Sequence, residues 1–432
     1  MFMENELIMT QYLDTKTVRK ESVENCFIFI ADLHLGTSFP FKYDPTVGFS
    51  RRTLDFFNVF DQINEYIINN DKIAKKTTLF ILGDLYDAIN PTPTIRAKTY
   101  EKLKAICDLG VQVHVIAGNH DITVEFEKSS SLNEIGLIKN LDIEVYREIK
   151  SIIIGDTGFL FIPFIYPQSI VERLEAKYSK KVPASDYNQF AQVELRKKIV
   201  KESSNLLDCR RRIALPHYFL SGARMSESYS LMPNELTIPL DFFNKNEQDN
   251  FPGFDLVIAG HVHYPQKITD KVFYVGSTER KFFNERDEIK RFLVLTDKLE
   301  SINIECRKQV EINLRIEKNL TPSAVNAALM TEASKFDVKE AMVKFIISCK
   351  SVDRQTIQSS LDFSTINKMA FHVYDPEFIS LEQAPTLVNQ EISNYSPSKF
   401  FLKYAKENNL DIETANLGLD IIKRIQKESE ED

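Results

Sequence analysis

Residues 256–264 read LVIAGHVHY, an apolar run that ends in two histidines one residue apart, His261 and His263. Side chains alternate between the two faces of a strand, so residues i and i+2 point the same way. The run therefore predicts a buried strand whose carboxyl end presents two imidazoles on one side. Alternating polar residues also occur on half-exposed strands, so this pair does not define a site by itself.

Five apolar runs, the opening one included, stop at a polar cluster in this way. Continuous apolar runs of this length suit strands that are covered on both faces. The runs are CFIFI (26–30), TLFIL (78–82), VQVHVIA (111–117), RIAL (212–215) and FDLVIA (254–259). Helical patterns around 51–70 and 94–108 separate the first three, as in βαβ units. An α/β fold is predicted, with functional groups gathered at the carboxyl ends of its strands.

The polar residues at these strand ends are of the kinds that bind metals. Carboxylate, amide and imidazole groups suit divalent manganese, iron or zinc, and one carboxylate can bridge two ions ~3.5–4 Å apart at a phosphoryl group. Any one cluster could be an exposed strand end, a turn or a helix cap, but five together favour a two-metal site. The candidates are Asp32, His34, Asp84, Asn119, His217, His261 and His263, with Asp87 and His120 beside them.

The histidines outside these clusters have a different expected role. The chain has 7 histidines, and only His114 and His372 lie elsewhere. His114 falls inside the third apolar run and faces away from a ligand position. We predict that it is a core histidine, and we predict the same for His372.

Composition limits the class of protein. A chain of 432 residues predicts two or three domains, and 43% hydrophobic with 27% charged residues is typical of a soluble globular protein. No apolar run approaches the ~20 residues that cross a bilayer, so no membrane association is expected. The 5 cysteines contain no CxxC pair, which argues against a zinc finger or a disulfide framework and favours a reducing, cytoplasmic location.

The net charge of -8 argues weakly against a protein that merely coats nucleic acid. Short basic clusters, among them Arg51-Arg52 and Arg196-Lys197-Lys198, could nevertheless contact phosphates. Solvated helix faces are the simpler explanation for any one of them.

The pattern of predicted strands and helices changes along the chain and predicts five segments. They are an N-terminal extension (1–25), an α/β domain (26–300), a small α+β domain (301–375), a linker (376–395) and a helical tail (396–432). In the tail, Ser396-Pro397 is a helix start, and Phe401, Tyr404 and Ala405 share one face. Its two short amphipathic helices need a partner surface, either another protein or this chain's own small domain.

The ordered motifs resemble the calcineurin-like metallophosphoesterase superfamily over about residues 27–300. The motifs are D-x-H (32–34), G-D-x-x-D (83–87), G-N-H-D (118–121), His217 and G-H-x-H (260–263). The resemblance implies a sandwich of two sheets flanked by helices, with two divalent ions. It implies one ion held by Asp32, His34 and His263, a second held by Asn119, His217 and His261, and Asp84 as the bridge. By the same resemblance His120 approaches the scissile phosphate as acid or stabiliser, oriented by Asp87.

Within this superfamily the chain is most similar to the nuclease subunits of the bacterial SbcCD complex and of meiotic-recombination double-strand-break repair, which include phage recombination endonuclease subunits. Protein phosphatases usually carry G-D-x-V-D-R-G and G-N-H-E, whereas this chain has GDLYDAIN and GNHD. The similar segments are ADLHLG, GDLYD followed by P-x-P, LPHYFLSGARMSES, GHVHYPQ and YVGSTERKFFNERDEIKRFLVL.

This closer resemblance implies a DNA exonuclease and endonuclease that uses two manganese ions on double-strand ends, hairpins and single strands. It implies a homodimer, a capping role for 301–375, and a coiled-coil ABC-type ATPase of the SbcC kind bound through the tail. The expected location is the cytoplasm or nucleoid, or the host cytoplasm for a phage protein. Two alternatives stay open: a nucleotide or small-molecule phosphodiesterase, and a catalytically inactive scaffold, although a scaffold has no reason to keep every ligand.

Overall fold

The computed structural model describes residues 25–70, 76–123, 130–138, 140–179, 181–225, 235–248, 251–317 and 321–381, together with Gly418. The predicted N-terminal extension lies outside these residues except for Asn25. The helical tail lies outside them except for Gly418, as does most of the predicted linker. No helix in the described part of the chain is long and apolar enough to cross a membrane.

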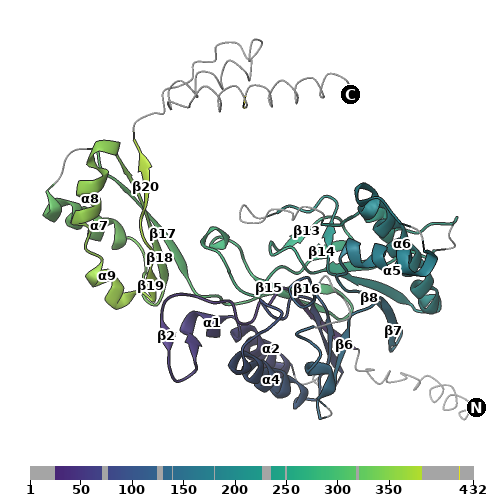
Figure 1. Ribbon diagram of the computed structural model, residues 1–432. Helices are drawn as coiled ribbons and strands as arrows, with labels where there is room; N and C mark the ends of the chain where they lie inside the picture. The colour runs from purple at the N-terminus through teal and green to yellow at the C-terminus, as the bar shows by residue number, and fades with distance from the viewer. Residues whose placement is uncertain are drawn as a thin grey trace, which may run out of the picture. The chain divides into compact units, whose positions relative to one another are not determined.

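Two six-stranded sheets form the main part of the fold (Figure 1). In the first, β1, β4, β5 and β6 are parallel, and β15 runs antiparallel to β1. Its order is β16 (Leu299–Asn303), β15 (Arg291–Leu295), β1 (Cys26–Ile30), β4 (Thr77–Leu82), β5 (Gln112–Ile116) and β6 (Ile143–Tyr146). In the second, β14, β12, β9 and β8 are parallel. Its order is β13 (Gln266–Lys267), β14 (Val272–Tyr274), β12 (Leu256–Ala259), β9 (Arg211–Pro216), β8 (Thr157–Ile162) and β7 (Lys150–Ile154).

The two sheets share an aromatic core. In β1, Phe27 and Phe29 belong to the cluster that the sheets have in common, whereas Ile28 and Ile30 belong to the cluster that includes the helices. The ring of Phe27 packs edge-on against Phe159 of the second sheet, with centroids 4.9 Å apart. Both faces of β1 are thus covered, as its unbroken apolar sequence predicts.

Helices cover the outer faces of both sheets. Helices α1 (Arg51–Asp55), α2 (Asn58–Asn69) and α4 (Pro93–Cys107) lie with the first sheet, and α5 (Pro167–Tyr178) and α6 (Tyr187–Ser203) with the second (Figure 1). Helix α4 begins where the sequence favours it, because Thr92 caps the amide of Ile95 and Pro93 occupies the first turn. The predicted α/β class with two sheets flanked by helices is confirmed.

A third sheet follows, with the order β17 (Gln309–Arg315), β18 (Met342–Cys349) and β19 (His372–Val373), and with β20 (Glu377–Ser380) paired to β18. Its sequence neighbours are α7 (Pro322–Ala333), α8 (Arg354–Ser360) and α9 (Ser364–Met369). The chain divides into two compact units. One is Met1–Ile312, Leu329–Phe345 and Asp362–Pro376, and the other is Asn313–Ala328, Ile346–Leu361 and Glu377–Asp432. The domain boundaries expected at 300 and 375 stay a prediction.

The two histidines outside the motifs differ in burial. His114 is buried in the core, as predicted, and its Nδ1 lies 2.9 Å from the hydroxyl of Tyr146. The prediction for His372 is wrong, because this side chain is only partly buried. It stacks face to face on Phe41 with ring centroids 3.7 Å apart. An apolar sequence neighbourhood does not reveal that His372 lies on a two-residue strand at the edge of the third sheet.

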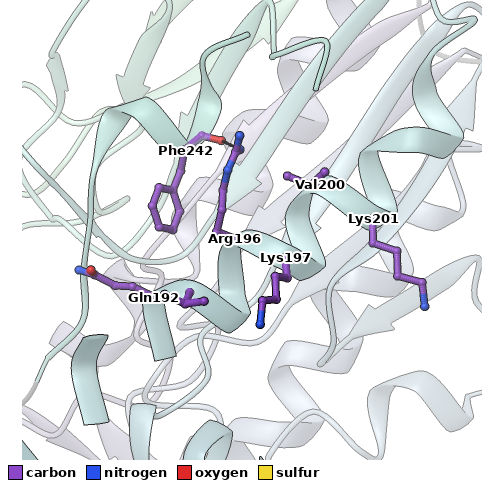
Figure 2. A pocket seen from close by; sticks show the side chains of 7 residues that line it. Gln192, Arg196, Lys197, Val200, Lys201 and Phe242 are labelled. Carbon is purple, nitrogen blue, oxygen red and sulfur yellow. Dashed lines mark hydrogen bonds between the residues drawn. The ribbon is translucent and has the colours of Figure 1, made fainter. Parts of the chain in front are cut away.

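Two of the basic clusters have different surroundings. Arg52 is fully buried and donates to Asp55 at 2.7 Å and to Glu279 at 3.2 Å, so it is neither a solvated side chain nor a phosphate contact. On α6, Arg196 and Lys197 line a surface cavity of about 550 Å³ beside Phe242 (Figure 2). The cavity is also lined by Gln192, Val193, Val200 and Lys201, so none of the strand-end candidates belongs to it.

Gly83, which follows β4, is required by its surroundings. Its φ is +89°, and a Cβ there would lie 2.0 Å from Nδ1 of His217. Only a residue without a side chain therefore lets the second sheet bring His217 against the end of β4.

We expect Gly83→Ala to lower the free energy of unfolding by ~1–3 kcal/mol more than Gly110→Ala. Gly110 is the matched control, because its φ is +82° but a Cβ added there would meet nothing within 4 Å. Both variants carry the ~1–2 kcal/mol cost of a left-handed backbone, and only Gly83→Ala displaces an imidazole. Urea denaturation measures both, and equal losses would contradict the steric explanation.

Candidate metal centre

The seven predicted ligands lie together at the carboxyl ends of five strands. Each exposes 8% or less of its surface. Asp32 and His34 follow β1, Asp84 follows β4, Asn119 follows β5, His217 follows β9, and His261 and His263 follow β12. Main-chain pairing joins the ends directly, since Asp32 N donates to Gly83 O at 3.1 Å and Gly260 N donates to Pro216 O at 3.1 Å. The first sheet thus contributes four of these side chains and the second contributes three.

The backbone is strained where several of these side chains leave it. Seven non-glycine residues of the described chain have positive φ, and four of them are predicted ligands. Their φ values are 52° at Asp32, 46° at His34, 49° at Asp84 and 97° at His261. Such conformations cost free energy and cluster at functional sites. The surrounding fold therefore imposes these ligand directions against local preference.

Asn119, His217 and His261 form one convergent group. The Oδ1 atom of Asn119 lies 3.2 Å from Nε2 of His217 and 3.0 Å from Nδ1 of His261. The other nitrogen of His217, Nδ1, lies 2.7 Å from the carbonyl oxygen of Leu82, which can only accept. His217 therefore carries a proton on Nδ1, and its Nε2 faces the amide oxygen of Asn119.

Asp32, His34 and His263 form a second group. The Nε2 atoms of His34 and His263 lie 2.8 Å apart. Nδ1 of His34 lies 3.1 Å from Oδ1 of Asp87, which favours a proton on Nδ1 and a lone pair on Nε2. Both carboxylate oxygens of Asp32 accept from the amide of His261, at 2.9 and 3.0 Å, and this fixes the carboxylate beside the imidazoles.

The carboxylate of Asp84 lies between the two groups. Its Oδ2 atom is 3.7 Å from Nε2 of His34 and 3.5 Å from Nε2 of His217. Its Oδ1 atom accepts from the amide of His120 at 2.9 Å. One oxygen of Asp84 thus faces an imidazole of each group.

The donor set fits divalent metal ions. Oxygen and nitrogen lone pairs face one another at hydrogen-bond distances, and such contacts are favourable only around a proton or a cation. Potential ligand atoms lie within 4.8 Å of one another in the trios Asp32–His34–His263, His34–Asp84–His120 and Asp32–Asp84–His217. Mixed carboxylate, amide and imidazole donors are those of borderline divalent ions. The expectation of a metal site is thereby supported, and the assignment of each ligand to an ion stays a prediction.

Burial and the charges of neighbouring side chains together control the protonation of these groups. It lowers the pKa of His34 to about 3, against the opposing effect of Asp87, so that this imidazole is neutral. Burial likewise raises the pKa of Asp32, with the neighbouring imidazoles acting in the opposite direction. At Asp84 burial also acts to raise the pKa, but the nearby histidines, His217 foremost, outweigh it and keep the pKa well below its usual range.

His120 and Asp87 lie beside the ligand groups. Nδ1 of His120 is 2.8 Å from the main-chain carbonyl oxygen of Asp87, and its ring packs edge-on against His34 with centroids 4.8 Å apart. The carboxylate of Asp87 contacts His34 and Lys281 instead. Asp87 thus orients His120 through its backbone.

Several residues around the predicted ligands are not apparent from the sequence pattern. The buried Asp121 accepts from Gly118 N at 2.9 Å and from Tyr86 N at 3.2 Å, so it ties two ligand turns together. It is the last residue of the GNHD motif, and that position was the only available signal. Two glutamates contact the G-H-x-H histidines, Glu235 at His261 and Glu285 at His263. Neither has metal-ligand spacing in the sequence, and only Glu285 lies within a segment quoted for the family resemblance, YVGSTERKFFNERDEIKRFLVL.

Comparison with known proteins agrees with this geometry. Residues 27–265 match the family model described as calcineurin-like phosphoesterase. The chain is 24% identical over 316 residues to the DNA double-strand break repair protein Mre11 of Methanocaldococcus jannaschii, covering 69% of this chain and 72% of that protein. It is 26% identical over 250 residues to the D subunit of the nuclease SbcCD of Bacillus subtilis, covering 55% of this chain and 56% of that protein. The corresponding protein of Staphylococcus epidermidis is 24% identical, with 50% and 54% covered.

The chain spans just over half the length of these bacterial relatives. A solved structure of a cold-active protein-tyrosine phosphatase from a Shewanella species aligns at 13% identity over 65% of this chain and 80% of that one, with a TM-score of 0.26. A similarity at that level supports no inference about this chain.

Proposed function

The chain belongs to the calcineurin-like phosphoesterase family, and from that premise we propose that it is a metal-dependent DNA nuclease acting at DNA ends in double-strand-break repair or recombination. Its similarity to Mre11 and to the SbcCD nuclease subunit supports the choice of substrate. We propose two manganese ions as cofactor, exonuclease action on double-strand ends, endonuclease action on hairpins and single strands, and a homodimeric assembly.

The observation that carries this proposal is the position of Asp84 between two groups of lone pairs. Oδ2 of Asp84 faces Nε2 of His34 on one side and Nε2 of His217 on the other. In the proposed assignment Asp84 bridges the ions. Asp32, His34 and His263 hold one, and Asn119, His217 and His261 hold the other. Two divalent metal ions bound there would polarise a phosphoryl oxygen and activate the attacking water.

We propose that His120 acts in proton transfer. Its Nδ1 donates to the carbonyl of Asp87 at 2.8 Å, which fixes the ring and leaves Nε2 free to point elsewhere. When both nitrogens are protonated, Nε2 can donate to a phosphate oxygen or to the leaving oxygen.

We expect the protein with Mn²⁺ to cleave an end-labelled DNA duplex, and His120→Ala to cleave it ~10²–10⁴-fold more slowly, as for loss of a general acid. The variant should keep two ions and its DNA affinity, because His120 is assigned to neither ion. Denaturing gels measure cleavage, elemental analysis measures bound manganese, and fluorescence anisotropy measures DNA binding.

The same experiment separates the alternatives. Loss of an ion from His120→Ala would show that this histidine is a ligand instead. Hydrolysis of a small phosphodiester reporter with duplex, hairpin and single-stranded DNA left intact would replace the nuclease with a small-molecule phosphodiesterase. Two bound ions without hydrolysis of either substrate would favour the inactive scaffold.

We further propose that 396–432 docks on a coiled-coil ABC-type ATPase. This segment lies outside the described residues except for Gly418, so its sequence carries the argument. The spacing of Phe401, Tyr404 and Ala405 predicts one helix face, and a second predicted helix start at Asp411 leads to an apolar stripe that includes Leu417 and Ile421. The bacterial relatives are named as subunits of a complex, which supports a partner protein over this chain's own small domain.

Deletion of 396–432 should abolish co-purification with the ATPase while metal-dependent nuclease activity of the isolated chain persists. Pull-down against the tagged ATPase and the duplex assay measure the two properties. Undiminished binding by the truncated chain would show that the tail is not the docking element. A lower melting temperature of the isolated truncated chain would indicate packing on its own small domain.

A further inference from the structure

Two buried glutamates contact the histidines of the G-H-x-H motif from behind. Oε1 of Glu235 contacts Nε2 of His261, and the Glu235 side chain is 4% exposed. Oε1 of Glu285 lies 3.6 Å from Nδ1 of His263, and the Glu285 side chain is 0% exposed. Two carboxylates are thus buried against two imidazoles that leave the same strand end.

Each glutamate meets the ring nitrogen that faces away from the other predicted ligands. In His261 the opposite nitrogen, Nδ1, lies 3.0 Å from Oδ1 of Asn119. In His263 the opposite nitrogen, Nε2, lies 2.8 Å from Nε2 of His34. The two rings therefore present different nitrogens to their groups, Nδ1 from one and Nε2 from the other.

A neutral imidazole has one N–H and one lone pair, and a carboxylate can only accept. A carboxylate at one nitrogen draws the proton there and leaves the lone pair on the other. We propose that Glu235 and Glu285 are positioning residues that hold His261 and His263 in opposite tautomers, so that Nδ1 of His261 and Nε2 of His263 are the ligand atoms. The inference rests on the proposed two-ion site and does not depend on the DNA substrate.

The fold holds Glu285 firmly in this position. Its second oxygen, Oε2, accepts from Nζ of the fully buried Lys290 at 2.9 Å. The same Nζ donates to the main-chain oxygen of His263 at 3.3 Å and to Oγ of Ser277 at 2.7 Å. Lys290 thus ties the carboxylate to the backbone of the histidine that it orients, and it balances the buried negative charge.

The burial of Oε1 of Glu285 is consistent with this role. Within the described chain, Oε1 is buried without a hydrogen-bond partner, and such groups are rare because they lose water without replacement. Nδ1 of His263 lies 3.6 Å from this oxygen, at ion-pair distance and just beyond hydrogen-bond distance. A carboxylate–histidine–metal arrangement explains why a buried oxygen is directed at this ring.

Glu235 reaches His261 through a short strand pairing. It precedes β11 (Thr237–Ile238), which pairs in parallel with β10 (Phe219–Leu220). Strand β10 begins two residues after His217, so the pairing brings Glu235 to the end of the second sheet where His261 lies. The position of this glutamate comes from tertiary structure, and no local motif encodes it.

The test is Mn²⁺ binding to the full chain, followed by calorimetry and by electron paramagnetic resonance of the bound ions. Glu235→Met and Glu285→Met remove the acceptor at similar volume, and each should weaken one of the two ions ~10–100-fold. Each variant should also replace the spin-coupled pair signal with that of a single ion at limiting Mn²⁺. Glu235→Gln and Glu285→Gln keep an acceptor oxygen and should lie between wild type and the Met variants.

Glu279→Met is the matched control, because Glu279 is buried but pairs with Arg52, at 3.2 Å, instead of a predicted ligand. It should bind both ions as wild type does. Equal affinity in all three Met variants would overturn the inference, whether all bind tightly or all bind weakly. If the Met variants fail to fold, the Gln variants decide. The inference is overturned if both Gln variants bind Mn²⁺ with wild-type affinity and give the wild-type spin-coupled signal. If the wild-type chain does not bind two Mn²⁺ ions, the two-ion site itself is overturned.

Discussion

The carboxylate of Asp84 lies between imidazoles of His34 and His217, and the rest of the candidate site is arranged around that position. Close approach makes the position possible. A Cβ on Gly118 would lie 2.1 Å from Oδ1 of Asp84, and one on Gly83 would lie 2.0 Å from His217. The strained φ of 49° at Asp84 is the local cost of directing its side chain between the two groups. These constraints explain why the residues before Asp84 and Asn119 are glycines.

The site also depends on the packing of the two sheets. Asp32, His34, Asp84 and Asn119 leave the first sheet, whereas His217, His261 and His263 leave the second. Neither sheet alone holds a complete group of the predicted ligands. The shared aromatic core, where Phe80 and Phe159 have ring centroids 4.6 Å apart, sets the distance between the two halves. Packing energy in that core therefore holds several imidazoles and carboxylates close together in a buried place.

Much of this arrangement could be predicted from the sequence, and the limits have a physical cause. The run CFIFI became β1 with the predicted bounds, and the clusters after five such runs converge. Strand β8 was not predicted, although it is central and buried, because its run TGFLFI leads into Pro163 and carries no ligand-type cluster. Glu235 and Glu285 were not predicted either. Periodicity and spacing reveal which residues share an element, whereas the neighbours of a ring nitrogen depend on how distant elements pack.

The central claim is that two ions share Asp84, and metal analysis of Asp84→Asn tests it most directly. The wild-type chain should bind two equivalents of Mn²⁺. The Asn variant keeps the side-chain shape but lacks the charge and bridging capacity of a carboxylate, so occupancy should fall at both positions and cleavage should be lost. Circular dichroism should show an unchanged fold. Two full equivalents of manganese in Asp84→Asn, with activity retained, would contradict the account.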